Sequence, residues 1–432
     1  MRVQHHASCF HRIWRFALLS SLLCLITAST GRAADWPAFR GPTGNGIAEG
    51  TGYALEWSKE KNIRWSVAMP IRGNESPIVS NGRVFVTSAT ANGTQRTLHC
   101  FDRADGKAVW TKPVTFDIVE KTHQTNPFGA ATPASDGERV VVWHGSAGLF
   151  CYDFEGTELW KRDLGQVGHI WGYGSSPVIH EGLVYLNFGP GKEQYLVALE
   201  LETGEEVWKF DEPGGNNDRG GKMTGSWSTP VIAAVGDRFQ LICSMPTRVV
   251  SLDPATGTLN WSCDGLDGRN GNLVYTSPVI GDGFGIAMGG YTGPALAFKL
   301  DGEGDVTETH RLWHATAKNP QRIGSGIIVG DSLFMANAGP GLLQCLDVAT
   351  GEERWKDRGP GGNFWSSMVL AEGRLYATNQ KGTTLVLAPN AEQYEKLGEN
   401  SLGEPSNSTP AFSDGDIFLR TSKMLYAITK SP

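Results

Sequence analysis

The sequence lacks the signatures that would assign a function directly. It has seven cysteines but no Cys-Cys pair and no Cys-x-x-Cys motif, so neither a disulfide framework nor a c-type haem is indicated. It also contains no Asp-x-Asp-x-Asp-Gly calcium loop and no complete phosphate-binding loop. We therefore expect no metal site and no nucleotide site.

Charge is scarce and unbalanced. Charged residues make up 19% of the chain, with 45 acidic against 38 cationic residues, which disfavours nucleic acid as a partner. Glycine and proline together supply 77 of the 432 residues, so long helices are not expected. Hydrophobic residues at 40%, with 10% aromatic, are enough for a large core and exclude a disordered chain.

The N-terminus reads as a secretory signal peptide, residues 1–34. Four arginines and no acid accompany an apolar run at 16–28 and the small residues GRAA at 31–34. The run has 13 residues, short of the roughly 20 needed to span a bilayer, so we expect no transmembrane span after cleavage. The mature chain would carry a net charge of −11 and five cysteines. We expect an exported protein that is periplasmic, associated with the cell envelope, or secreted.

A repeat organises the rest of the chain. Its copies include ESPIVSNGRVFVT at 75–87, ATPASDGERVVVW at 131–143, SSPVIHEGLVYLN at 175–187, TSPVIGDGFGIAM at 276–288 and STPAFSDGDIFLR at 408–420. A proline, or the residue replacing it, marks each of eight copies, about 48 residues apart; these markers are Pro77, Pro133, Pro177, Pro230, Pro278, Gly326, Met368 and Pro410. Each copy contains four short strand-like runs separated by glycine turns.

These features predict an all-β protein, an eight-bladed β-propeller with four-stranded antiparallel blades. The last copy ends before its fourth strand, whereas residues 62–67 place an extra strand with Trp65 ahead of the first marker. We therefore expect the N-terminal strand to complete the eighth blade and close the ring. The predicted domains are the signal peptide 1–34, an N-terminal extension 35–61 and the propeller 62–432.

One tryptophan recurs at the same position of the repeat, which predicts a structural role in docking one blade against the next. These residues are Trp65, Trp110, Trp160, Trp208, Trp261, Trp313 and Trp355. The seventh copy has no tryptophan, so Tyr394 or Leu397 is expected to fill the gap. Three cysteines share a second repeat position with alanine and serine and are expected to be buried thiols, whereas pairing of Cys243 with Cys263 is left open.

Loop length distinguishes the two faces of the predicted ring. The turns after the first and third strands are short, and these form the plain face. The remaining connections are long and individual, and these form the long-loop face, where binding groups are expected. Aromatic, histidine and arginine residues there that the repeat does not explain are the candidates for binding a partner or ligand: His169, Trp171, Tyr173, Trp227, Tyr291, Arg322 and Trp365. No catalytic residue is predicted.

The motif DxxTGxxxW, complete at 253–261 and 347–355, resembles the tryptophan-docking motif of PQQ-type propellers. The absence of any Trp-Asp dipeptide excludes WD40 repeats. The segment WPAFRG at 36–41 is similar to the start of secreted PQQ-like propellers that are often grouped with the outer-membrane assembly factor BamB. The resemblance covers about residues 62–428.

The resemblance implies two classes of function. Quinoprotein dehydrogenases of this type bind PQQ and Ca²⁺ and carry adjacent cysteines, whereas BamB-like members act as scaffolds for other proteins. Because this sequence has neither the cysteine pair nor a calcium pattern, we expect no cofactor and a non-catalytic binding or scaffold protein of the cell envelope. Its partner would be another envelope protein or a carbohydrate. The alternatives are a propeller that binds carbohydrate or another small molecule, and a PQQ-dependent dehydrogenase.

Overall fold

The computed structural model describes residues 34–215 and 222–430. The predicted signal peptide lies outside these residues, except for Ala34. No helix among the described residues is long and apolar enough to cross a membrane.

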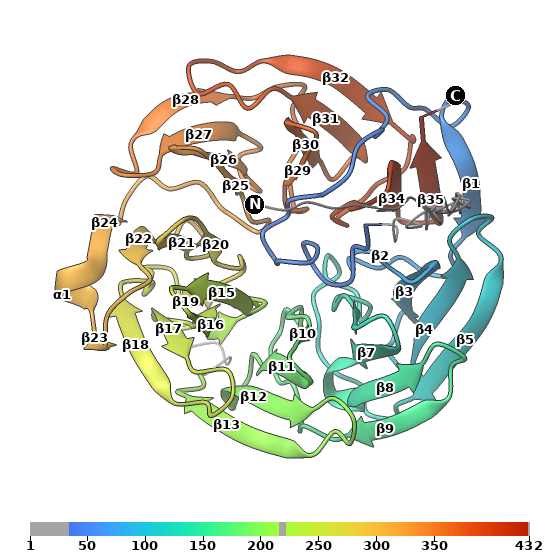
Figure 1. Ribbon diagram of the computed structural model, residues 1–432, viewed down its shortest axis with the longest axis horizontal. Coiled ribbons are helices and arrows are strands. Elements are labelled where there is room, and N and C mark those ends of the chain that lie inside the picture. Colours follow the sequence, from blue (N-terminus) through green and yellow to red (C-terminus); the bar gives the residue numbers. More distant parts are fainter. Residues whose placement is uncertain (1–33, 216–221, 431–432) are drawn as a thin grey trace, which may run out of the picture. The chain divides into compact units, whose positions relative to one another are not determined.

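Eight antiparallel sheets follow one another around a ring (Figure 1). In each of the first seven, the strands run from the inside of the ring outward in chain order. The first four blades are β2 (Ile78–Ser80), β3 (Arg83–Ala89), β4 (Gln95–Asp102) and β5 (Ala108–Thr115); β6 (Ala134–Ser135), β7 (Arg139–Trp143), β8 (Leu149–Asp153) and β9 (Glu158–Arg162); β10 (Val178–His180), β11 (Leu183–Phe188), β12 (Gln194–Glu200) and β13 (Glu206–Glu212); and β15 (Val231–Val235), β16 (Arg238–Ser244), β17 (Arg248–Leu252) and β18 (Leu259–Asp264).

The other four blades repeat the arrangement and confirm the predicted fold. They are β20 (Val279–Ile280), β21 (Phe284–Met288), β22 (Ala295–Lys299) and β24 (Arg311–Ala315); β25 (Ile327–Val329), β26 (Ser332–Ala336), β27 (Leu343–Asp347) and β28 (Glu353–Asp357); β29 (Val369–Ala371), β30 (Arg374–Thr378), β31 (Thr383–Leu387) and β32 (Lys396–Ser401); and β33 (Ala411–Ser413), β34 (Asp416–Arg420), β35 (Met424–Thr429) and β1 (Ile63–Ala68). Short additions are β14 (Thr224–Ser226), β19 (Asn272–Val274), β23 (Gly304–Asp305), η1 (Gly145–Ala147) and α1 (Thr307–His310).

The N-terminal strand closes the ring, as predicted. β1 pairs antiparallel with β35, and Trp65 lies opposite Ala427 in their register. The eighth blade therefore takes three strands from the end of the chain and its outer strand from the beginning. This pairing covers the edge of β35 that would otherwise be exposed.

The repeated tryptophans dock neighbouring blades, and the register explains the rest of the motif. In seven of the eight blades the tryptophan of the outer strand lies opposite a small residue of the third strand, as in the pair Trp110 and Cys100. In four of them the indole also packs on an aromatic ring of the second strand; Trp110 lies 5.8 Å from Phe85 between ring centroids. All five cysteines in the described residues are buried free thiols, and β17 separates the strands of Cys243 and Cys263.

The next blade covers the outer face of five of the seven indoles with a glycine; these are Trp65, Trp110, Trp160, Trp208 and Trp313. Gly106 has a φ of +73° and packs so closely on Trp65 that a Cβ atom there would lie 2.6 Å from the indole. Only glycine meets both requirements, which accounts for the Thr-Gly turn of the repeat. All seven predicted docking tryptophans donate Nε1–H to a carbonyl of the following blade, at 2.7–3.0 Å.

The seventh blade corrects one prediction. The residue at its docking position is Gly398, opposite Val386, and the missing indole comes from Trp57 in the N-terminal extension. Trp57 stacks on Tyr376 at 6.4 Å and an interplanar angle of 16°, and its backbone N–H donates to Asn400 Oδ1. Unlike the seven indoles of the repeat, its Nε1–H has no hydrogen-bond partner in the described residues. The predicted substitutes do not fill the gap, because Tyr394 packs on Trp355 of the preceding blade and Leu397 is exposed. Sequence periodicity cannot identify a partner that comes from outside the repeat.

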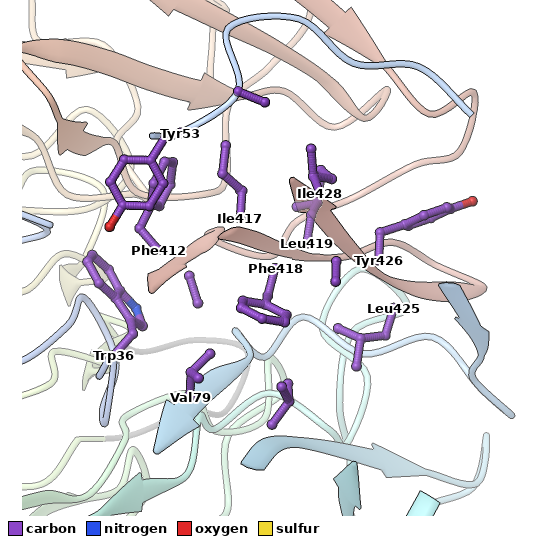
Figure 2. Packing of buried hydrophobic residues seen from close by; sticks show 14 of the residues in the cluster. Trp36, Tyr53, Val79, Phe412, Ile417, Phe418, Leu419, Leu425, Tyr426 and Ile428 are labelled. Atoms are coloured by element: carbon purple, nitrogen blue, oxygen red, sulfur yellow. The ribbon is translucent and has the colours of Figure 1, made fainter. Parts of the chain in front are cut away.

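The N-terminal extension forms a strap, residues 35–61, that crosses the plain face from blade to blade. Trp36 exchanges two backbone hydrogen bonds with Val79, and Ile47 pairs in parallel with Leu370. The buried Arg40 donates to the carbonyls of Ser325 and Gly326 in the sixth blade, which holds the strap against the inner strands. Figure 2 shows Trp36 and Tyr53 of the strap packed against Phe412, in a cluster that continues into the eighth blade.

A ring of hydroxyl groups links the blades on the other side of the inner strands. The residue before each marker is serine or threonine. In seven of the eight cases its hydroxyl accepts a hydrogen bond, at 2.9–3.1 Å, from the backbone N–H of the equivalent residue in the blade before; the hydroxyls are those of Thr132, Ser176, Thr229, Ser325, Ser367, Thr409 and Ser76. The hydroxyl of Ser277 has no hydrogen-bond partner in the described residues. These bonds fix the spacing of the eight loops that enter the blades.

Trp57→Ala should lower the free energy of unfolding by about 3–5 kcal/mol, because it empties a docking site that is otherwise filled by a fully packed indole. Urea denaturation followed by far-ultraviolet circular dichroism measures the change. Leu397→Ala on the neighbouring strand is the matched control and should change it by less than about 0.5 kcal/mol. A similar small loss for both variants would contradict the assignment of Trp57 to the seventh docking site.

Candidate functional site

A cavity of about 320 Å³ opens on the long-loop face at the centre of the ring. One position of the repeat, three residues before each marker, supplies a column of eight residues that surrounds the cavity. These residues are Asn74, Ala130, Gly174, Trp227, Tyr275, Ile323, Trp365 and Asn407. Phe39 of the strap also lines the cavity, from the side of the plain face. Each of the eight loops that enter the blades therefore contributes at least one residue to the lining.

Aromatic rings dominate one side of the cavity. Trp227 and Tyr275 lie 5.2 Å apart between ring centroids, and Trp171 lies 5.1 Å from Tyr291 and 6.1 Å from Trp227. Trp171 and Trp365 are partly exposed, and Tyr291 is 39% exposed. The result is a concave surface of ring faces and edges, which suits an apolar or aromatic occupant.

The amide side chains of the cavity are already hydrogen-bonded to the protein. Asn126 donates to the carbonyls of Trp171 and Tyr173, and Asn74 donates to the carbonyl of Thr125. Asn407 donates to Asn74 Oδ1 at 3.0 Å and accepts from Gln380. These amides position the loops and leave few groups free to bind a strongly polar ligand.

Among residues 34–215 and 222–430, the cavity lining contains no aspartate, glutamate, lysine or arginine, and His123 is its one imidazole. No group of three or more His, Cys, Asp or Glu side chains in the described residues could hold a metal ion. Ca²⁺ in proteins prefers several oxygen ligands, usually with carboxylates among them. The residues present therefore do not fit Ca²⁺, and they offer no cation to pair with the carboxylates of PQQ.

Four of the seven predicted binding residues line the cavity: Trp171, Trp227, Tyr291 and Trp365. The other three do not. Tyr173 is buried, packs on Trp143 and donates its hydroxyl to the carbonyl of Phe128. Arg322 is buried outside the lining, and its Nε and Nη1 have no hydrogen-bond partner in the part of the chain that is described. Burial lowers the pKa of Arg322 to about 10.

Sequence reasoning missed Tyr275, Phe39 and the two asparagines, Asn74 and Asn407. The signal was present in the repeat, because all but Phe39 stand three residues before a marker. Comparing that column between the eight copies would have identified the ring of lining residues. Phe39 carries no such signal, since the strap lies outside the repeat.

His169 supports the aromatic side from behind. It is 1% exposed, meets Trp227 edge-on at 4.8 Å, and its Nδ1 accepts the backbone N–H of Trp171 at 3.2 Å. Burial lowers the pKa of His169 to about 4. Protonation of Nδ1 would both charge a buried ring and remove the acceptor that holds Trp171.

The folded-state pKa of His169 lies below its ordinary value of 6.5, so its contribution to stability is complete above pH 6.5 and is lost as the pH falls towards 4. His169→Asn keeps an acceptor near Nδ1 but cannot be protonated. When the pH is lowered from about 7.5 to about 5, the wild type should lose about 2 kcal/mol more of its free energy of unfolding than His169→Asn does. Urea titrations at the two pH values measure this. His123→Asn is the control, and an equal pH dependence in the wild type and in His169→Asn would contradict the assignment.

Known proteins resemble this chain in sequence and in fold. The sequence model of the family described as "Outer membrane protein assembly factor BamB" matches residues 13–115 and 94–357. The chain is 22% identical over 353 residues to the outer membrane protein assembly factor BamB of Burkholderia pseudomallei, covering 73% of this chain and 84% of that protein. It is 24% identical over 318 residues to the quinohemoprotein alcohol dehydrogenase of Comamonas testosteroni, covering 59% of this chain but only 42% of the dehydrogenase.

Solved structures show the same fold. BamB from Moraxella catarrhalis superimposes with a TM-score of 0.60 at 14% identity, covering 85% of this chain and 99% of that one. The Comamonas testosteroni dehydrogenase gives 0.62 at 15% identity, covering 92% of this chain and 81% of that one. The fold is thus shared with both an outer membrane assembly factor and a dehydrogenase, while the family model covers well over half of the sequence. The chain therefore belongs to the BamB family of PQQ-like β-propellers.

Proposed function

We propose that this protein is a non-catalytic binding protein of the cell envelope, and that its long-loop face receives a partner protein. An apolar or aromatic side chain of the partner would occupy the central cavity. The observation that carries the proposal is the uncharged cavity built from Trp171, Trp227, Tyr275, Tyr291 and Trp365. Large aromatic residues at a concave centre are typical of the residues that dominate the free energy of protein association.

The free polar groups of the cavity support a protein segment as the occupant. The indoles of Trp171 and Trp365 and the hydroxyls of Tyr275 and Tyr291 have no hydrogen-bond partner within residues 34–215 and 222–430. They can donate to one or two acceptors, such as the carbonyl groups of a short peptide turn. Rings with an apolar body and a polar edge suit such partly hydrated interfaces.

The same residues offer little for catalysis, since His123, the imidazole of the lining, is hydrogen-bonded through Nδ1 to the hydroxyl of Thr125. General acid–base chemistry needs a titratable group within hydrogen-bond reach of the substrate, and nucleophilic catalysis also needs a base beside the nucleophile. The lining hydroxyls of Ser76, Ser367 and Thr409 accept backbone N–H groups in the hydroxyl ring, and no carboxylate lies beside them in the cavity lining.

Location and domain organisation complete the proposal. Residues 1–34 act as a signal peptide that is removed on export, and residues 35–61 and 62–432 form the strap and the propeller. The BamB relatives are named as outer membrane assembly factors, which supports an envelope location for this protein. A carbohydrate remains the second candidate for the cavity, because aromatic faces can also stack on sugar rings.

Replacing Trp171 or Trp365 by alanine should weaken binding of the partner protein about 30-fold each, the effect of losing about 2 kcal/mol. The partner is identified by mass spectrometry of material that co-purifies from the native host, and affinity is measured by surface plasmon resonance. The urea midpoint should change little, because both indoles are partly exposed.

Asp282→Lys on the opposite face is the matched control, since Asp282 is exposed in the short turn after a first strand. The proposal fails if Asp282→Lys abolishes binding while both tryptophan variants bind normally. Displacement of the partner by an added oligosaccharide, with loss of oligosaccharide binding in the same two variants, would favour the carbohydrate.

Purified protein should not bind PQQ in the presence of Ca²⁺, because the cavity offers no charged group to either one. Equilibrium dialysis with both compounds, followed by absorbance of the quinone, provides the measurement. Stoichiometric binding together with oxidation of an alcohol by an artificial electron acceptor would overturn the non-catalytic assignment.

A further inference from the structure

The strap pairs with the same backbone position in several blades. In each first strand the second residue after the marker points its N–H and C=O away from its own sheet, towards the ring axis. Val79 exchanges two bonds of 2.9 Å with Trp36, and Leu370 makes two bonds of 2.8 Å, donating to Gly46 and accepting from Ala48. The first strands are thus inner edges of the sheets, and the strap extends two of them as an added strand would.

The third and fourth blades have the same inner edges without the strap. In β10 a two-residue turn joins His180 to Leu183, so these two residues form the closing hydrogen-bonded pair and Ile179 lies between hydrogen-bonded pairs. The N–H and C=O of Ile179 therefore point outward, as those of Val79 do. In β15 the register likewise points the N–H and C=O groups of Ile232 and Ala234 outward. Within the described residues no hydrogen bond from another segment reaches these backbone groups.

These edges line a second cavity of about 370 Å³ on the plain face, bounded on one side by residues 37–45 of the strap. Its apolar surface includes Ile179, Val231, Ile232 and Phe239, and Phe239 is 44% exposed. The lining contains no aspartate, glutamate, lysine or arginine. The surface therefore combines unpaired strand edges with a neutral apolar floor, which is the chemistry that recognises an extended peptide.

One end of this groove is acidic. Ile179 and His180 also line an adjoining depression that contains Glu181, Glu200 and Glu202. Arg139, its one cation, is paired with Asp136 at 3.3 Å. A cationic side chain beside the apolar part of a bound peptide would be complementary to the three remaining carboxylates.

We propose that the inner edges of β10 and β15 bind an extended peptide segment of a partner protein. The segment is apolar where it crosses the groove and carries a lysine or arginine at the end beside Glu181, Glu200 and Glu202. The bound segment would add to the inner edges of the third and fourth blades, as the strap adds to those of the first and seventh blades. The linings of this groove and of the aromatic cavity share Phe39 and Thr229, but the strand edges and carboxylates proposed to bind the peptide belong to the groove alone. The proposal therefore does not depend on the function proposed for the aromatic cavity.

The test removes the backbone donors and leaves the sheets intact. Proline has no N–H and is tolerated in an edge strand where the N–H points away from the sheet. The double variant Ile179→Pro/Ile232→Pro therefore loses the two outward donors. Ile328→Pro is the matched control, because Ile328 holds the same position in β25 but does not line the groove.

A random heptapeptide library displayed on phage is selected on the full chain and, in parallel, on both variants. We expect peptides with an apolar core and a flanking lysine or arginine to be enriched on the wild type and on Ile328→Pro, but not on the double variant. The enriched peptides, made synthetically, should lose roughly tenfold in affinity when the backbone amides that face the groove are N-methylated. Glu200→Gln/Glu202→Gln should weaken binding several-fold at low salt.

N-methylation needs only the native protein, so it decides the question even if the double variant fails to fold. The proposal is overturned if no sequence is enriched, if the double variant enriches the same sequences, or if N-methylated peptides bind equally well. Trp171→Ala should leave peptide binding unchanged, which separates failure here from failure of the function proposed for the long-loop face.

Discussion

The indole that docks one blade against the next is the contact on which the ring depends. In the seven blades where it comes from the repeat, it lies opposite a small residue and donates its N–H to a carbonyl of the following blade. Most of these indoles also pack on an aromatic ring of the second strand or are covered by a left-handed glycine of the following blade. Trp65 shows the full set, since it lies opposite Ala427, packs on Phe418 and is covered by Gly106. Because each contact joins two blades, the stability of one blade is tied to the sequence of the next.

In the seventh blade the indole that docks the blade comes from a segment outside the repeat. Gly398 leaves an open position, and the backbone of Leu55 comes within 3.1 Å of where its Cβ would be. Trp57 then supplies the indole, and the strap that carries it is held by Arg40 at the sixth blade and by Trp36 at the first. The strap is thus a structural part of the ring, and it also bounds both cavities.

The fold could be predicted from the sequence because its determinants repeat. The same local geometry recurs at the eight markers, the seven indoles and the Thr-Gly turns. The number of blades and the closure by β1 therefore follow from periodicity alone. The partner of Gly398 could not be predicted, since Trp57 is more than 300 residues away in the chain and outside the pattern. For the site, loop length and residue type indicated Trp171 and Trp365, but they also selected Tyr173, whose role in packing depends on Trp143 and Phe128.

The hydroxyl ring explains how one scaffold can carry unrelated functions. Its bonds hold the residue before each marker in place, so the residue two positions earlier projects to the centre whatever its identity. The chemistry of the cavity therefore depends in part on eight residues that contribute little to the repeat. In this chain they are two asparagines, three aromatic residues, isoleucine, alanine and glycine, and none carries a charge. Overall similarity to an outer membrane assembly factor and to a dehydrogenase cannot distinguish the two functions, because the fold is the same in both. The residues that line the cavity are therefore the basis of the function proposed here.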